Sequence, residues 1–212
     1  MYFVNKVCPV CLSITRELAK YFACPTKDHW KALLRLVGYI KGNIGKGRLL
    51  KKPKEIQIVA FTDSDFANRE DRKSVTGGVV TLGGVPTNAI SKTQAIVSPS
   101  STEVEYIALS TMAQEVLIQS QMLDELVGDQ HIKSSVIFED NLGSICLTKN
   151  SQISQRTKHI DVRHHFIRSM INNKVLDVKF VKSRLNTSDT MTKNVAEDQF
   201  FKHEKSTNGK MI

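Results

Sequence analysis

The sequence has few cysteines, and this scarcity excludes one class of protein. Its 212 residues include four cysteines, at positions 8, 11, 24 and 146, scattered along the chain. Small secreted scaffolds held by disulfides use a denser set, so we expect free thiols in a reducing compartment. Cys8 and Cys11 have half of a zinc-site spacing, but no second pair follows at a suitable distance, which disfavours a zinc site.

Long hydrophobic runs are also missing. No apolar stretch approaches the roughly 20 residues that a membrane-spanning helix needs. The N-terminal stretch MYFVNKVCPVCLSI is interrupted by polar residues and by proline, and no clean signal-peptidase site follows it. We therefore expect neither a membrane partner nor a signal peptide.

Acidic residues are outnumbered. The chain has 30 Lys and Arg against 21 Asp and Glu, for a formal net charge of +9. This excess favours a polyanionic partner, and nucleic acid is the first expectation. The alternative is a basic protein without such a partner. The hydrophobic fraction of 41% is enough to form a core, in one large domain or in one domain with an appendage.

The acidic residues that are present include a pair at the end of an apolar stretch. Residues 55–66 read EIQIVAFTDSDF, a run of β-forming residues that predicts a buried strand. Asp63 and Asp65 are two residues apart, so they share one face of that strand. Two carboxylates on one face are unfavourable in a core but suit a divalent cation. This pair is therefore a candidate metal site, to which other carboxylates could contribute.

Two further carboxylates lie at the ends of predicted elements. Glu105 lies in the first turns of a predicted helix. An acidic residue there usually complements the helix dipole, which accounts for Glu103. It accounts less well for Glu105, which is three residues from Ala108 and so shares its apolar side of the helix. The predicted strand 134–138 is followed by Glu139 and Asp140. In sheets flanked by helices, ligand sites collect at the C-terminal ends of strands, which makes Asp140 a candidate.

The chain as a whole predicts the order β-β-β-α-β-α, an extra helix, and then β-α. A Gly-Gly pair at positions 83 and 84 predicts a hairpin turn between the second and third strands. Thr26 is a predicted helix N-cap without a full capping box, and Ser101 or Thr102 is expected to cap the longest helix. The predicted strands are 55–66, 77–82, 85–91, 134–138 and 175–181, and the predicted helices lie within 12–41, 100–128, 141–147 and 156–172 and after 189.

Five motifs follow one another along the chain: FTDSDFANREDRKSVTGG, SSTEVEYIALS, FEDNLGSICLTKN, RTKHIDVRHHFIR and SDTMTK. They resemble, in order, the patterns sDaDwAgd-ddRkStsGy, SSTEAEYmAL, cDNqsAi-la-Np, RtKHIdiryHfiRe and vADilTKpL of the ribonuclease H domain in copia-type LTR retrotransposon Pol polyproteins. The segment PTKDHWKALLRLVGYIKG resembles the connection that follows the reverse transcriptase in these polyproteins. The resemblance covers nearly the whole chain.

The resemblance implies a ribonuclease H-like α/β fold. This is a mixed five-stranded sheet, with its first three strands antiparallel, flanked by helices and preceded by a helical extension. It implies three parts: residues 1–54 from the end of the reverse transcriptase or its connection, 55–194 as the ribonuclease H-like domain, and 195–212 as a tail. It also implies a partner, the reverse transcriptase domain of the same polyprotein, and a location in the cytoplasm, within a virus-like particle, or in the nucleus.

The implied activity is hydrolysis of the RNA strand of an RNA/DNA hybrid during reverse transcription. The resemblance implies two Mg²⁺ ions, for which Mn²⁺ can substitute, held by catalytic carboxylates. By the motifs these carboxylates are Asp63, Glu105, Asp140 and Asp189. The residues implied or expected to contact the nucleic acid are Arg72, Lys73, Ser74, Arg156, Lys158, Arg163 and Arg168.

Other interpretations stay open. Asp161 is the alternative to Asp189 as the fourth metal ligand. However, it lies near the start of a basic helix, where its carboxylate can stabilise the helix dipole or pair with His165 or Arg163. The chain departs from the family patterns at Ala89, where Trp is usual, and at Ser188, where Ala is usual. A catalytically inert, diverged fragment that binds nucleic acid or is structural is therefore the alternative function. A DDE-type integrase is disfavoured, because it needs a late Glu after its second Asp.

Overall fold

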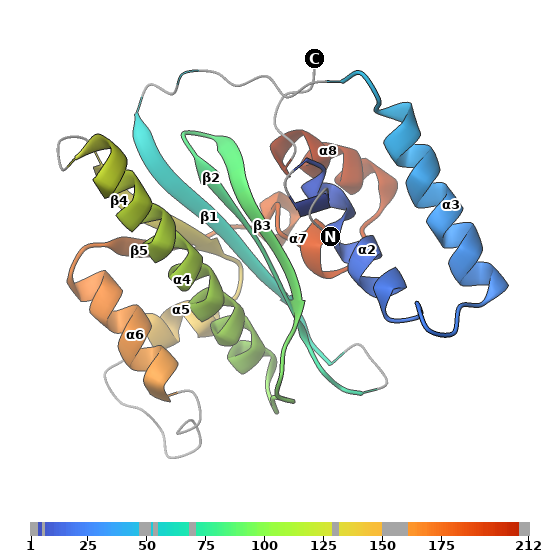
Figure 1. Cartoon of the computed structure of the whole chain (residues 1–212). Helices are drawn as coiled ribbons and strands as arrows, with labels where there is room; N and C mark the ends of the chain where they lie inside the picture. Colours follow the sequence, from blue (N-terminus) through green and yellow to red (C-terminus); the bar gives the residue numbers. More distant parts are fainter. Residues whose placement is uncertain are drawn as a thin grey trace.

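The computed structural model describes residues 4–5, 7–46, 52, 55–67, 71–128, 132–149 and 161–207. Among these residues five strands form one mixed sheet, flanked by helices (Figure 1). The strands are β1 (Ile56–Asp65), β2 (Val75–Leu82), β3 (Val85–Thr93), β4 (Ile132–Glu139) and β5 (Leu176–Phe180), in the order β3-β2-β1-β4-β5. The helices are α2 (Leu12–Ala19), α3 (Lys27–Gly42), α4 (Ser101–Val127), α5 (Leu142–Lys149), α6 (Asp161–Asn172), α7 (Asp189–Thr192) and α8 (Glu197–Thr207), with 3-10 turns η1 (Pro9–Cys11) and η3 (Ser183–Leu185).

The strand pairing confirms the predicted fold class. β1, β2 and β3 pair antiparallel, while β4 pairs parallel to β1 and β5 pairs parallel to β4. The β2–β3 hairpin turns at Gly83 and Gly84, with φ of 56° and 82°. Two consecutive positive φ values are what a two-residue hairpin turn needs, and glycine adopts them without steric cost.

One face of the sheet packs against α4 and α6. Ile58 and Ala60 of β1 and Ile137 of β4 are buried there, with Tyr106 and Leu109 of α4. Alternate residues of a strand point to opposite faces, and neighbouring positions therefore contribute to different cores. In β2, for example, Val80 belongs to this core, while Val79 belongs to a second core on the opposite face.

The opposite face of β2 and β3 is covered by the N-terminal segment together with α7. Val10, Leu12, Val79, Ala89 and Met191 form this second core. Ala89 is fully buried, and the side-chain amide of Asn5 donates a hydrogen bond to its carbonyl oxygen, at 3.0 Å. The small residue found where the family has Trp is therefore covered by the chain's own N-terminal part.

Two helix starts differ from the prediction. α3 does have a full capping box: the Thr26 hydroxyl accepts from the His29 amide at 3.3 Å, and His29 Nδ1 accepts from the Thr26 amide at 3.1 Å. A neutral imidazole nitrogen accepts a hydrogen bond as the usual Glu or Gln does, although the capping-box sequence pattern includes only Glu or Gln at this position. The N-cap of α4 is Ser100, without a side-chain cap bond, where Ser101 or Thr102 was expected.

The helical spacing of Trp30, Leu33, Leu34, Val37 and Ile40 predicts one apolar face for α3, but the helix packs on the rest of the molecule through a different side. Leu36 and Tyr39 lie against the second core, and the Tyr39 ring contacts Phe200 of α8, with 5.7 Å between ring centroids. The predicted apolar face is exposed: Trp30 is 59% and Leu34 is 51% accessible. Helical periodicity identifies apolar residues but cannot say which of two apolar sides finds a partner.

Within the described residues, no helix is long and apolar enough to cross a membrane. All four cysteines are free thiols, as expected. The C-terminal part forms a helix, α8, through Thr207.

Candidate active site

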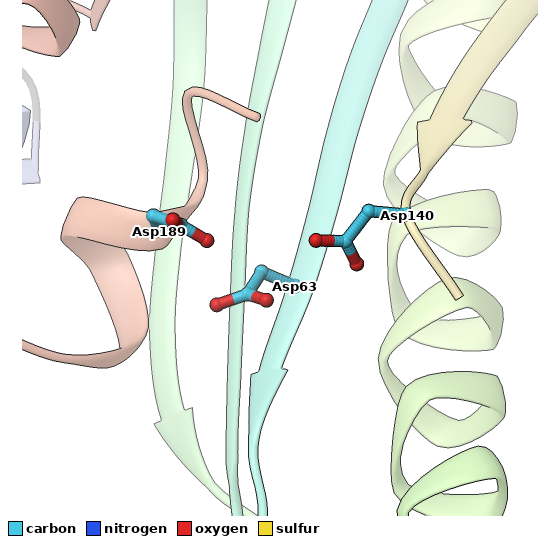
Figure 2. Close-up of side chains that lie close together, drawn as sticks. All are labelled: Asp63, Asp140 and Asp189. Carbon is cyan, nitrogen blue, oxygen red and sulfur yellow. The ribbon is translucent and has the colours of Figure 1, made fainter. Parts of the chain in front are cut away.

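Three of the predicted carboxylates meet at one edge of the sheet (Figure 2). Asp63 lies near the end of β1, Asp140 directly follows β4, and Asp189 begins α7. One carboxylate oxygen from each lies within 4.8 Å of the other two. β1 and β4 are neighbouring parallel strands, so their C-terminal ends meet at the same edge, which is where ligand sites form.

A second acidic group shares Asp140 with the first. Here carboxylate oxygens of Glu105, Glu139 and Asp140 lie within 4.8 Å of one another. Glu105 reaches this place because the start of α4 packs against β1 and β4. The four predicted site residues are thus divided between two overlapping groups, while their roles remain predictions.

Glu139, the third member of this second group, is not among the site residues that the sequence predicts. It is fully buried, and one of its carboxylate oxygens accepts a hydrogen bond from the amide of Asn141 at 3.0 Å. The available signal was the residue type, because the family pattern has Cys directly before the aspartate where this chain has Glu139.

The position of Asp189 depends on contacts between distant parts of the chain. The side-chain amide of Asn186 donates to the carbonyl oxygen of Thr62 on β1, at 2.8 Å. The Ser188 hydroxyl donates to Asn186 Oδ1 at 2.5 Å, so the serine that replaces the family's Ala helps to hold this turn. The Gln199 amide of α8 donates to Asp189 Oδ2 at 3.0 Å. α7 is thereby held beside β1.

Two other aspartates lie in neither acidic group. Asp161, the alternative to Asp189, is in the first turn of α6, and its Oδ1 lies 3.6 Å from His165 Nε2. The pair with His165 is one of the two structural roles expected for it. Asp65 belongs to neither acidic group, so the described residues give no support to the expectation that it shares a cation with Asp63. β4 pairs with β1 only as far as Phe61, and Asp65 lies further on, lining a neighbouring hollow with Arg16 and Lys193.

Lys193 provides a positive charge inside the first acidic group. Its Nζ lies 3.6 Å from Asp63 Oδ2 and 3.3 Å from Asp189 Oδ1. Burial raises the pKa of Asp63 to about 7, although Lys193 opposes this change, and burial also raises the pKa of Asp189. Burial lowers the pKa of Lys193, but attraction to the two aspartates outweighs it, and the pKa is raised.

The second group has no such cation among its described neighbours. Burial raises the pKa of Glu105 to about 10, and the charge of Glu139 raises it further; burial also raises the pKa of Glu139. Oε2 of Glu105 and Oε2 of Glu139 are both buried without a hydrogen-bond partner. Unpartnered buried carboxylate oxygens are costly. Hard oxygen donors of this kind fit a bound Mg²⁺ or Mn²⁺ ion, so the residues present are compatible with the implied metal.

The predicted nucleic-acid contacts differ in their accessibility. Arg72 is exposed and Lys73 is half-buried. Ser74 is buried, and its hydroxyl accepts from the Ala67 amide at 3.1 Å. It therefore braces the connection between β1 and β2 and is not available to touch a substrate.

The basic residues predicted near α6 are only partly described. Arg163 and Arg168 are half-buried on this helix. Arg168 donates a long hydrogen bond of 3.5 Å to the carbonyl oxygen of Leu147, near the end of α5. Arg156 and Lys158 lie outside the described residues.

The sheet order, with carboxylates gathered at the ends of β1 and β4, defines a ribonuclease H-like fold. The chain is 35% identical over 184 residues to the Retrovirus-related Pol polyprotein from transposon TNT 1-94 of Nicotiana tabacum, which covers 86% of this chain. It is 36% identical over 185 residues to the corresponding polyprotein from transposon RE2 of Arabidopsis thaliana, which covers 87% of this chain. The chain belongs to the family of copia-type retrotransposon Pol polyproteins.

The chain spans only 14% and 13% of the length of these two relatives. No protein-family model matches it. Among solved structures, it is similar to LC11-RNase H1, isolated from compost, with a TM-score of 0.49 and 16% sequence identity, over 64% of this chain and 92% of that one.

Proposed function

We propose that this chain is a divalent-metal-dependent endonuclease that hydrolyses the RNA strand of RNA/DNA hybrids during retrotransposon reverse transcription. The observation that carries the proposal is the convergence of Asp63, Glu105, Asp140 and Asp189 from four separate elements on one edge of the sheet. A group of buried carboxylates is unfavourable in a purely structural role, because like charges repel one another in a poorly hydrated site.

The carboxylates would hold two metal ions, with Asp140 shared between the two acidic groups. Bound Mg²⁺ would activate a water molecule as the nucleophile and stabilise the leaving 3′ oxygen. The protein's own contribution is to fix the ligands. The Thr192 hydroxyl hydrogen bonds to Asp63, and Gln199 hydrogen bonds to Asp189, so both carboxylates are oriented by neighbours.

The net charge of +9 supports a polyanionic substrate. Among the described residues, Arg72, Lys73 and Arg163 are accessible enough to contact phosphates. The RNA strand of a hybrid would be distinguished from DNA through its 2′-hydroxyl groups.

We also propose a partner, the reverse transcriptase part of the same polyprotein. The relatives are Pol polyproteins several times longer than this chain. The exposed side of α3, with Trp30, Leu34 and Val37, is the apolar surface that such a neighbour would cover. The activity would then act where the element is copied, in a cytoplasmic virus-like particle or in the nucleus.

One observation favours the inert alternative. Lys193 neutralises part of the first acidic group without any metal, so the fold can form with that group unused. An inert domain would still bind nucleic acid through its net positive charge.

The test is cleavage of a hybrid carrying a labelled RNA strand, with duplex DNA as the control substrate. We expect RNA cleavage in Mg²⁺ or Mn²⁺, none in EDTA, and intact duplex DNA. Asp140→Asn should abolish cleavage while hybrid binding stays equal or becomes tighter, because a negative charge near the phosphates is lost. Binding without cleavage by the unaltered chain would support the inert alternative, and equal loss of binding and cleavage in the variant would mark Asp140 as structural.

A further inference from the structure

The two acidic groups differ in how their charge is balanced. In the first group, Lys193 Nζ lies within 3.6 Å of Asp63 and within 3.3 Å of Asp189. Among the described residues, Glu105, Glu139 and Asp140 form no ion pair within 4.0 Å. The first group is therefore partly neutralised by the protein itself, and the second is not.

Glu139 is built into the second group and is not a surface residue that happens to be acidic. Its side chain is fully buried, and Glu105 is only 8% exposed. One oxygen of Glu139, Oε1, accepts a hydrogen bond from the backbone amide of Asn141 at the start of α5, and this bond orients the carboxylate. The other oxygen is buried and without a partner, as is Oε2 of Glu105. Two buried oxygens without a hydrogen-bond partner, beside Asp140, suit a divalent cation as their partner.

We propose that Glu139 is a fifth metal-binding carboxylate, and that the group Glu105–Glu139–Asp140 is the tighter cation site, which fills first. The inference rests on the proposed function only in taking the ligand to be a divalent cation. A cation that displaces the protons of Glu105 and Glu139 meets three carboxylates with no ion pair among the described residues, whereas the Asp63–Asp140–Asp189 group already shares Lys193. Binding at the Asp63–Asp140–Asp189 group must displace or work against the lysine charge, so that site fills at higher metal concentration.

The test measures metal binding directly, without substrate. Mn²⁺ is titrated into the full chain and followed by the paramagnetic signal of free Mn²⁺ and by the rise in melting temperature. The unaltered chain should bind in two steps. Glu139→Gln keeps the oxygen that accepts from Asn141, and it should weaken the first step by about 10-fold or more. Glu125→Gln, on the exposed end of α4, removes one charge elsewhere and should leave both steps unchanged.

Lys193→Met is the complementary variant. It should tighten the second step more than the first, because Lys193 pairs with Asp63 and Asp189 and acts on the shared Asp140 only as a weaker, more distant charge. A circular dichroism spectrum confirms that each variant is folded. Mn²⁺ affinities that are equal in the unaltered chain and in Glu139→Gln would overturn the proposal and leave Glu139 as a cap of α5.

A greater tightening of the first step than of the second by Lys193→Met would overturn the order of filling. These outcomes are distinct from failure of the proposed function, in which the chain binds Mn²⁺ in two steps but does not cut a hybrid.

Discussion

At the scale of single residues, the candidate site consists of acidic side chains held in place by neutral ones. Thr192 hydrogen bonds to Asp63, Gln199 to Asp189, and the Asn141 amide to Glu139. Hydrogen bonds of this kind fix the direction of each carboxylate before a metal arrives, which preserves affinity when the ligands are few.

The assignment of the fourth ligand gives the first prediction at this scale. Asp189→Asn should lower the cleavage rate and raise the Mg²⁺ concentration that is needed, since Asp189 lies in an acidic group. Asp161→Asn should leave the cleavage rate unchanged and lower the free energy of unfolding by about 0.5 kcal/mol, because the negative charge that stabilises the start of α6 is lost. Rate against Mg²⁺ concentration and thermal melting check both variants. If Asp161→Asn stopped cleavage in a chain with a normal melting temperature, the assignment would be wrong.

His164 gives a prediction for pH. The ring stacks on Tyr106 with 4.2 Å between centroids, and both of its nitrogens are buried without a hydrogen-bond partner. Burial lowers the pKa of His164 below its ordinary value of 6.5. The unfolded chain therefore takes up this proton first, and the folded state loses stability as the pH falls below about 6.5.

The variant His164→Phe keeps the stacking and removes the proton. It should be more stable than the unaltered chain at pH 5.5, by about 1 kcal/mol, with a smaller difference at pH 8. Urea unfolding at the two pH values measures this difference. His165→Gln, at the exposed neighbouring position, is the control, and an equal pH effect in both variants would contradict the role given to His164.

At the scale of elements, the site depends on the close approach of α7 to β2. Gly77 lies where a side chain would overlap Thr192 and would lie 2.9 Å from Met191 Cβ and 3.2 Å from the Met191 backbone carbon. The three atoms nearest to a Cβ at the neighbouring Gly78 would instead belong to the side chain of Met112 on α4. The absence of a side chain at Gly77 is therefore what lets α7 bring Asp189 and Thr192 to the end of β1.

Gly77→Ala should thus destabilise the chain by about 1–3 kcal/mol and also lower its cleavage rate, because α7 must move. Gly78→Ala should lower stability through Met112 without a comparable loss of rate at a temperature where the chain remains folded. Melting curves and cleavage rates measured together separate the two effects. A normal rate in folded Gly77→Ala would mean that α7 tolerates the shift.

At the scale of the whole molecule, the excess of positive charge predicts how binding responds to salt. The logarithm of hybrid affinity should fall linearly with the logarithm of salt concentration, with a slope near −0.9 for each phosphate neutralised on a B-form duplex and a somewhat different slope for a hybrid. Arg72→Gln, at an exposed position, should make that slope shallower by the contribution of about one phosphate contact. Affinities between low and moderate salt check this, and a flat response would remove electrostatics as the main source of binding.

Much of this architecture could be read from local patterns. Runs of β-forming residues predict the strands, Gly83 and Gly84 predict the hairpin, and the family motifs predict the four carboxylates that the structure gathers into two groups. These features are local because a strand, a two-residue turn and a motif are each defined by neighbours in the chain.

What only the tertiary structure decided involves residues that are far apart in the sequence. Asn186 reaches Thr62 on β1, which fixes α7, and Lys193 reaches Asp63. The sequence by itself could not exclude Asp65 or include Glu139, because both are acidic residues at a strand end. They differ because α4 and α7 bring different side chains to the edge of the sheet beside each of them. The packing of α4 and α7 depends on long-range contacts, which local sequence periodicity does not predict.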